Sequence, residues 1–93
     1  MLIVKKFGGT SVCNKERIFN VEKRCIEDYQ KGHDIVVVLS AMGKSTDELI
    51  EMARDINPRP SKREMDMLLS SGEQISAALL AMAIERMGYP VVS

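Results

Sequence analysis

The sequence lacks several features that mark whole classes of protein. Its 13 basic and 13 acidic residues cancel, and without a net positive charge the attraction that drives non-specific nucleic-acid binding is missing. Apolar runs such as Ile35–Leu39 are too short to cross a bilayer, and the first residues do not resemble a signal peptide. We therefore expect neither a nucleic-acid partner nor a membrane partner.

Cysteine is also scarce. Cys13 and Cys25 are the two cysteines, twelve positions apart, which is neither a disulfide framework nor a metal-ligand spacing. The low cysteine usage favours a reduced, cytoplasmic protein. Cys25 lies on the apolar stripe of a predicted helix, so we expect it in the core, where free cysteine is often found.

The remaining composition is that of an ordinary globular chain. Hydrophobic residues make up 45% and charged residues 28%, which is too apolar for a disordered tail. The 93 residues are enough for one small domain. A chain of this size buries a small share of its surface, so we expect a marginal core.

Hydrophobic periodicity and capping signals predict alternating strands and helices. Ile35–Leu39 is apolar on both faces, as in a strand buried between two layers. Ser70, Ser71 and Gly72 interrupt the last helical pattern, where Ser71 and Gln74 have the spacing to cap a restart, so we expect a kink or break there. The predicted elements are a strand at 2–7, a helix ending at Lys31 before Gly32, a strand at 35–39, a helix from Ser45 to Ile56, a long helical region from Ser61 to Gly88, and a strand from Tyr89. The apolar stripe of the first helix is Ile18, Val21, Cys25 and Tyr29, and Ser45 with Glu48 and Ser61 with Glu64 have capping-box spacing at the starts of the next two helical segments.

This order, β-α-β-α-α-β, predicts an α/β fold with a parallel sheet and helices on its faces, a three-layer αβα arrangement. In such sheets ligands bind at the carboxyl ends of the strands. Two loops are expected at that edge, residues 8–11 and residues 40–44.

The first loop combines groups that suit a phosphate. Lys6 precedes Gly8 and Gly9, which can bring bare backbone N–H groups close to an anion. Thr10 and Ser11 add hydroxyl groups, and the positive end of the next helix is expected at the same place. The alternative is a tight turn with a surface lysine, because this spacing alone is not specific.

Two other segments give weaker signals. Gly43-Lys44-Ser45 resembles the end of a P-loop, but Val38 stands where the P-loop requires a glycine, so that interpretation fails. Glu73 follows Gly72 among mostly apolar neighbours. A carboxylate there can cap a helix or bind the ammonium group of a ligand. No combination of residues has metal-ligand spacing, and no metal site is expected.

Taken together, these segments resemble the N-terminal motifs of aspartate kinases, within the wider amino-acid kinase family. The resemblance extends over about residues 3–93 in the order found in the family, and Lys6–Ser11 is its most specific part. The four similar segments are Lys6–Val12, Val36–Gly43, Thr46–Leu49, and Arg63–Ser70 with Gly72–Gln74.

What the resemblance implies is transfer of the γ-phosphoryl group of Mg-ATP to the β-carboxylate of L-aspartate. Lys6 would neutralise the phosphoryl oxygens as the catalytic residue, while Gly8 and Gly9 would donate backbone N–H groups. Ser11 would help to orient the phosphate. The residues implied in binding the amino acid are Ser40, Thr46 and Glu73.

The same resemblance implies that residues 1–93 are the first part of an amino-acid kinase domain. The nucleotide-binding half, the residues that help hold the metal of Mg-ATP, and regulatory domains would lie outside this chain. We expect these 93 residues alone to be inactive, and the complete protein to be a homo-oligomer. Met67, Leu80 and Met87 are expected on apolar surface that the missing half would cover. Two alternatives stay open: another kinase of the same family, and a non-catalytic module that only folds, associates or binds phosphate.

Overall fold

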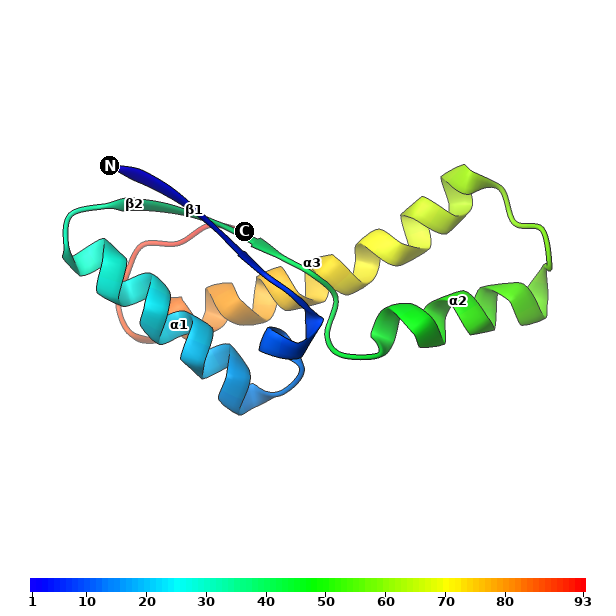
Figure 1. Ribbon diagram of the computed structural model, residues 1–93, viewed down its shortest axis with the longest axis horizontal. Helices are drawn as coiled ribbons and strands as arrows, with labels where there is room; N and C mark the ends of the chain where they lie inside the picture. Colours follow the sequence, from blue (N-terminus) through cyan, green and yellow to red (C-terminus); the bar gives the residue numbers. More distant parts are fainter.

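The computed structural model describes residues 1–93 and contains a two-stranded parallel sheet. Strand β1 (Leu2–Phe7) pairs with β2 (Asp34–Leu39), and α1 (Lys15–Gln30) connects them (Figure 1). Phe7 is aligned with Leu39 at the end of the register. Because the strands are parallel and end together, the loops that follow them begin side by side.

Helix α1 follows its sequence signals. Ile18, Val21 and Cys25 are buried along one face, as the spacing predicts, whereas Tyr29 at the end of the predicted stripe is 41% exposed. The Asn14 side chain caps the start by accepting a hydrogen bond from the Arg17 N–H at 2.9 Å. Gly32 follows the end with φ +91°, and its N–H donates to the Tyr29 carbonyl at 3.0 Å, as expected of a glycine after a helix.

Helices α2 (Ser45–Ile56) and α3 (Lys62–Arg86) form a hairpin. Helix α2 and the first part of α3 extend away from the sheet, and the rest of α3 lies under it (Figure 1). The predicted capping at Ser61 is confirmed, since its Oγ accepts a hydrogen bond from the Glu64 N–H at 3.3 Å. The predicted cap at Ser45 is wrong: α2 begins after Lys44 without a side-chain cap. With the hairpin, the molecule measures 49 × 24 × 17 Å.

Helix α3 runs without the break predicted at residues 70–72. The hydroxyl groups of Ser70 and Ser71 donate to the Met67 and Leu68 carbonyl oxygens at 2.9 and 2.6 Å. Hydroxyl groups that bond within the helix are not available to cap a new start. Gly72 has a packing role that is described below. The helix therefore continues through a segment whose local signals favour an interruption.

The parallel α/β class is confirmed, and within this chain the helices cover one face of the sheet. Helices α1 and α3 pack against β2 on the face that carries the half-buried Ile35, Val37 and Leu39. The opposite face is open, so the double-sided burial predicted for 35–39 does not occur within these residues. The exposed apolar side chains on that face are Leu2, Val4, Val36 and Val38.

The strand predicted from Tyr89 does not form. Residues 89–93 have no regular structure, and their backbone makes no hydrogen bond to β2. The Tyr89 side chain is nevertheless placed, because its hydroxyl accepts a hydrogen bond from Gln30 Nε2 at 2.6 Å and its ring meets that of Tyr29 edge-on. Because residues 89–93 have no neighbouring strand to which their backbone bonds, they keep these side-chain contacts but do not adopt strand geometry.

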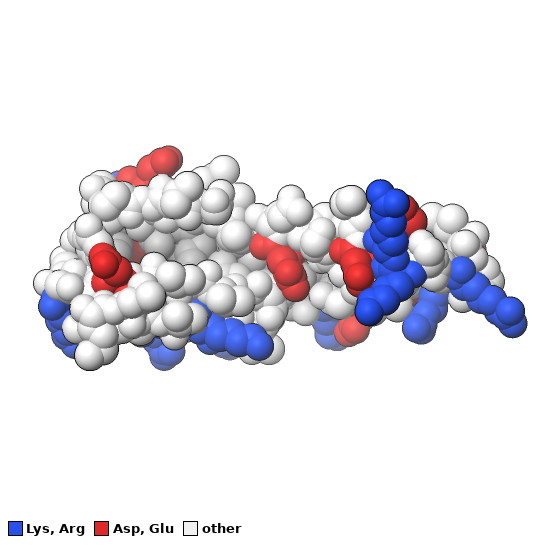
Figure 2. Space-filling model, turned by 90° about the horizontal axis from the view of Figure 1, so that it is seen from above, with Lys and Arg blue, Asp and Glu red and all other residues white.

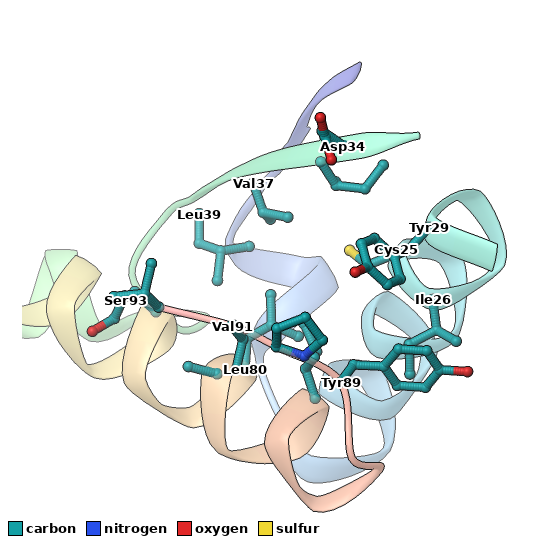
Figure 3. A pocket seen from close by; sticks show the side chains of 16 residues that line it. Cys25, Ile26, Tyr29, Asp34, Val37, Leu39, Leu80, Tyr89, Val91 and Ser93 are labelled. Atoms are coloured by element: carbon teal, nitrogen blue, oxygen red, sulfur yellow. The ribbon is translucent and has the colours of Figure 1, made fainter. Parts of the chain in front are cut away.

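These last residues border an apolar groove of about 610 Å³. Val37 and Leu39 of β2, Cys25 of α1 and Leu80 of α3 line it together with Val91 (Figure 3). In the space-filling view the same part of the molecule shows a hollow among uncharged atoms (Figure 2). The expectation that Leu80 is exposed is wrong, since it is 4% exposed, whereas Met67 and Met87 lie on the surface as expected.

Helix α3 is long and apolar enough to cross a membrane by length and composition alone, with a mean hydropathy of 1.4 over its most apolar window. Here it packs against α1, α2 and β2. Core helices of α/β proteins pass the same test of length and composition.

Candidate active site

The two loops at the carboxyl ends of the strands are joined by hydrogen bonds. The Ser40 N–H donates to the Phe7 carbonyl at 3.2 Å, and the Gly43 N–H donates to the Gly9 carbonyl at 3.0 Å. Gly43 has φ +49°, a backbone conformation that glycine adopts without steric cost. The structure thus brings together the two loops that the sequence places at one edge.

A third segment reaches the same place through close packing. A Cβ atom on Gly9 would lie 2.9 Å from the Ala41 carbonyl oxygen. One on Gly72 would lie 2.8 Å from the Ala41 Cβ atom. Side-chain carbons do not pack at such distances, so both positions need glycine. Ala41 is buried between them, and Glu73 is the next residue along α3.

Lys6 lies at the end of β1 on the open face of the sheet and is exposed. It forms no ion pair, whereas its neighbour Lys5 points to the other face and forms a salt bridge with Asp28 of α1. The hydrogen bond from Lys5 holds the pKa of the Asp28 carboxyl below its usual range. One lysine is thus used to hold a helix, while the other is free to meet an anion.

The glycine loop differs from expectation in the helix that follows it. A 3-10 helix, η1 (Gly9–Val12), comes first, and α1 starts only at Lys15 after its Asn14 cap. The α-helix therefore begins six residues after Gly9, and the Asn14 side chain caps it at the Arg17 N–H. Gly8 and Gly9 donate no hydrogen bond to a loop carbonyl, which leaves both N–H groups available to a ligand.

Ser11 is half-buried, and its backbone N–H donates to the Gly8 carbonyl at 3.1 Å. Ser11 also lines a small hollow of about 100 Å³ together with Phe7 and two arginines of α1, Arg17 and Arg24. These two arginines were not among the predicted site residues. Their spacing of seven on the solvent side of an amphipathic helix is also that of ordinary surface residues, so no local signal distinguishes them.

The residues that the resemblance implies in binding the amino-acid substrate lie in three different segments. Ser40 directly follows β2, and Thr46 is in the first turn of α2, both half-buried. Glu73 is exposed in the interior of α3, and no hydrogen bond or ion pair involves its side chain. The capping alternative for Glu73 is wrong, because α3 neither ends nor restarts there.

Charged ligands of metal ions do not gather at this edge. No three His, Cys, Asp or Glu side chains lie close enough together to hold a metal ion. The groups around the two loops are the lysines Lys6 and Lys44, backbone N–H groups and hydroxyl groups, with carboxylates nearby on α2 and α3 that form no ion pair. Such a set can bind a phosphate next to a small ligand that carries an ammonium group.

The sequence profile of the amino acid kinase family matches residues 1–93. The chain belongs to the amino acid kinase family. Within that family it is similar to the N-terminal segment of aspartokinases. It is 63% identical over 92 residues to the aspartokinase of Geobacillus stearothermophilus and 60% identical over 92 residues to aspartokinase 2 of Bacillus subtilis, in each case over 99% of this chain.

A solved structure is similar as well. The crystal structure of aspartate kinase from Synechocystis superposes with a TM-score of 0.96 at 54% sequence identity over 99% of this chain. The chain spans 23% and 22% of the lengths of the two curated relatives and 16% of the Synechocystis chain. The recognised kinase motifs therefore lie in a segment that corresponds to less than a quarter of these relatives.

Proposed function

We propose that this chain is the segment of an aspartokinase that binds the transferred phosphoryl group and L-aspartate. The observation that carries the proposal is the junction at Ala41, where the glycine loop, the loop after β2 and the turn of α3 that precedes Glu73 pack together. This packing of segments far apart in the sequence supports a site in which the phosphate and the ammonium group of the amino acid bind close together. The similarity to aspartokinases along the whole chain supports the same activity.

The reaction proposed is a direct phosphoryl transfer. A β-carboxylate oxygen of L-aspartate attacks the γ-phosphorus of Mg-ATP, a new P–O bond forms, and the bond to the bridging oxygen of ADP breaks. The products are β-aspartyl phosphate and ADP. Such a transfer needs alignment and charge stabilisation more than covalent help from the protein, which fits a site that consists of a lysine, N–H groups and hydroxyl groups.

Each residue then has a role on the phosphate side. Lys6 neutralises the charge that spreads over the phosphoryl oxygens in the transition state. Gly8 and Gly9 donate their unengaged N–H groups to the same oxygens. Ser11 orients the phosphate from the side of η1. The magnesium ion would enter with ATP, held mainly by its phosphates and by residues outside this chain.

On the amino-acid side, the unpaired carboxylate of Glu73 binds the ammonium group of aspartate. Ser40 and Thr46 orient the substrate from the loop after β2 and from the first turn of α2. The nucleotide-binding half belongs to the rest of the complete enzyme. We accordingly propose that residues 1–93 alone do not turn over substrate, and that the complete enzyme is a cytoplasmic homo-oligomer without nucleic-acid or membrane partners. It would catalyse the first step of lysine, threonine and methionine biosynthesis.

A substrate panel tests the proposal on the full-length protein that contains this chain. Hydroxylamine traps the acyl phosphate as a hydroxamate, so aspartate, glutamate and N-acetylglutamate can be compared in one assay. We expect hydroxamate with aspartate and almost none with the other two. A preference for glutamate or N-acetylglutamate would move the protein to another branch of the family. No product with any of the three would support a non-catalytic module.

A further inference from the structure

Ala41 is the contact through which α3 meets the phosphate loop. On one side its carbonyl oxygen faces Gly9, and the Gly43 N–H two residues on donates to the Gly9 carbonyl at 3.0 Å. On its other side the Ala41 methyl group faces the backbone of Gly72. The loop after β2 is thus held to the glycine loop by backbone groups, and its Ala41 methyl group packs against α3 at Gly72.

The helix at Gly72 is packed too closely to accommodate a larger neighbour by a local change of its backbone. Ser76, one turn further on, is 0% exposed, and its hydroxyl donates to the Gly72 carbonyl at 3.4 Å. Interiors are packed closely enough that an added methyl group displaces a whole segment. A change of size at this contact would therefore move α3, and Glu73 with it, away from the glycine loop.

We propose that the Ala41–Gly72 contact is a spacer that sets the distance between the phosphate loop and Glu73, and so determines how aspartate is positioned for transfer. The inference rests on the proposed function, in which Glu73 binds the ammonium group of aspartate. Ala41 and Gly72 are positioning residues, because they act through Glu73 and touch no substrate. Misplacement of reacting groups by about 1 Å can cost roughly 10²-fold in rate, so a small spacer suffices.

Gly72→Ala in the full-length enzyme tests the spacer directly. The new methyl group would lie 2.8 Å from the Ala41 Cβ atom. We expect the KM for aspartate to rise about tenfold or more and kcat to fall, while the KM for ATP stays within about twofold. Loss of helix stability cannot produce this result, because alanine favours a helix over glycine by about 1 kcal/mol.

Rescue by a second substitution separates spacing from other effects. In Ala41→Gly/Gly72→Ala the clashing methyl group is gone, and the next atoms around position 72 are the Ala41 Cα at 3.9 Å and the Leu49 Cδ1 at 4.0 Å, both in ordinary contact. We expect the aspartate KM of this double variant to return to within about threefold of wild type. Gly9→Ala is the matched control. Its new methyl group would meet the carbonyl oxygen of Ala41, which Ala41→Gly does not remove, so Ala41→Gly should not rescue this variant.

The outcomes distinguish this inference from the proposed function. If wild type phosphorylates aspartate and Glu73→Gln raises its KM, but Gly72→Ala has a normal KM or is not rescued, only the spacer is overturned. A crystal structure of Gly72→Ala gives a readout independent of activity. It should show a longer distance from Gly9 to Glu73 than wild type, restored in the double variant, and an unchanged distance would contradict the inference.

Discussion

The guanidinium of Arg86, at the end of α3, donates hydrogen bonds to both carboxylate oxygens of Glu22 on α1, at 3.3 and 3.5 Å. The Cζ atom of Arg86 also lies 4.5 Å from the centre of the Phe19 ring, in cation–π range. Glu22 is 4% exposed, so its charge depends on this partner. The pair fixes the two helices that cover the sheet, 64 residues apart in the chain.

Arg86→Ala should therefore destabilise the chain. The substitution leaves a buried carboxylate without its partner, which we expect to cost about 2 kcal/mol, less than for a fully buried pair because the Arg86 side chain is 55% exposed. Urea unfolding measures the loss. The double variant Glu22→Gln/Arg86→Ala should recover part of it, and equal losses in single and double variants would show that packing on Phe19 alone matters.

The Lys5–Asp28 salt bridge predicts a dependence of stability on pH. The pKa of Asp28 is lowered in the folded chain, so the pair stabilises above the unfolded pKa of about 4, and the contribution is lost as the pH falls through the folded pKa. Asp28→Asn should reduce the difference between the urea midpoints at pH 7 and pH 3. An unchanged difference would mean that other carboxylates account for the acid sensitivity.

The two cysteines should differ in reactivity. Burial raises the pKa of the Cys25 thiol, in part opposed by the charge of Lys5, and Cys25 is buried while Cys13 is exposed. Because the thiolate is the reactive form, iodoacetamide should alkylate Cys13 first and reach Cys25 only on unfolding. Mass spectrometry of the peptides measures both rates, with Cys13→Ser as the control. Similar rates in the folded chain would contradict the described core.

Local signals predicted much of this fold because several of them agreed. The Ser61 cap, the stripe of Ile18, Val21 and Cys25, and Gly32 each involve residues within one turn of one another. The predicted break in α3 failed for a tertiary reason: Gly72 is required by Ala41, 31 positions earlier, and not by a bend. No pattern within α3 could indicate that contact.

The arrangement of the two loops at the candidate site was also predictable from the sequence. The rule for parallel sheets placed the loops after β1 and β2 at one edge, and the Gly43–Gly9 hydrogen bond agrees with it. The 3-10 helix after Gly8 was missed, because a short 3-10 turn and the start of an α-helix have similar sequence signals. The partnership of Glu22 with Arg86 was also missed, since polar pairs between distant helices leave no periodic signal.

The contrast between Lys6 and Lys5 is the most direct test of the proposed active site. Each is replaced by methionine in the full-length enzyme, and kcat for aspartate-dependent ADP formation is measured. Lys6→Met should lose about 10²-fold or more, because a preorganised charge on the transferred phosphoryl group is gone. Lys5→Met should stay within about threefold, because Lys5 contacts Asp28 on the other face. Near-normal turnover by Lys6→Met, or equal losses in both variants, would contradict the assignment of this edge as the phosphoryl-transfer site.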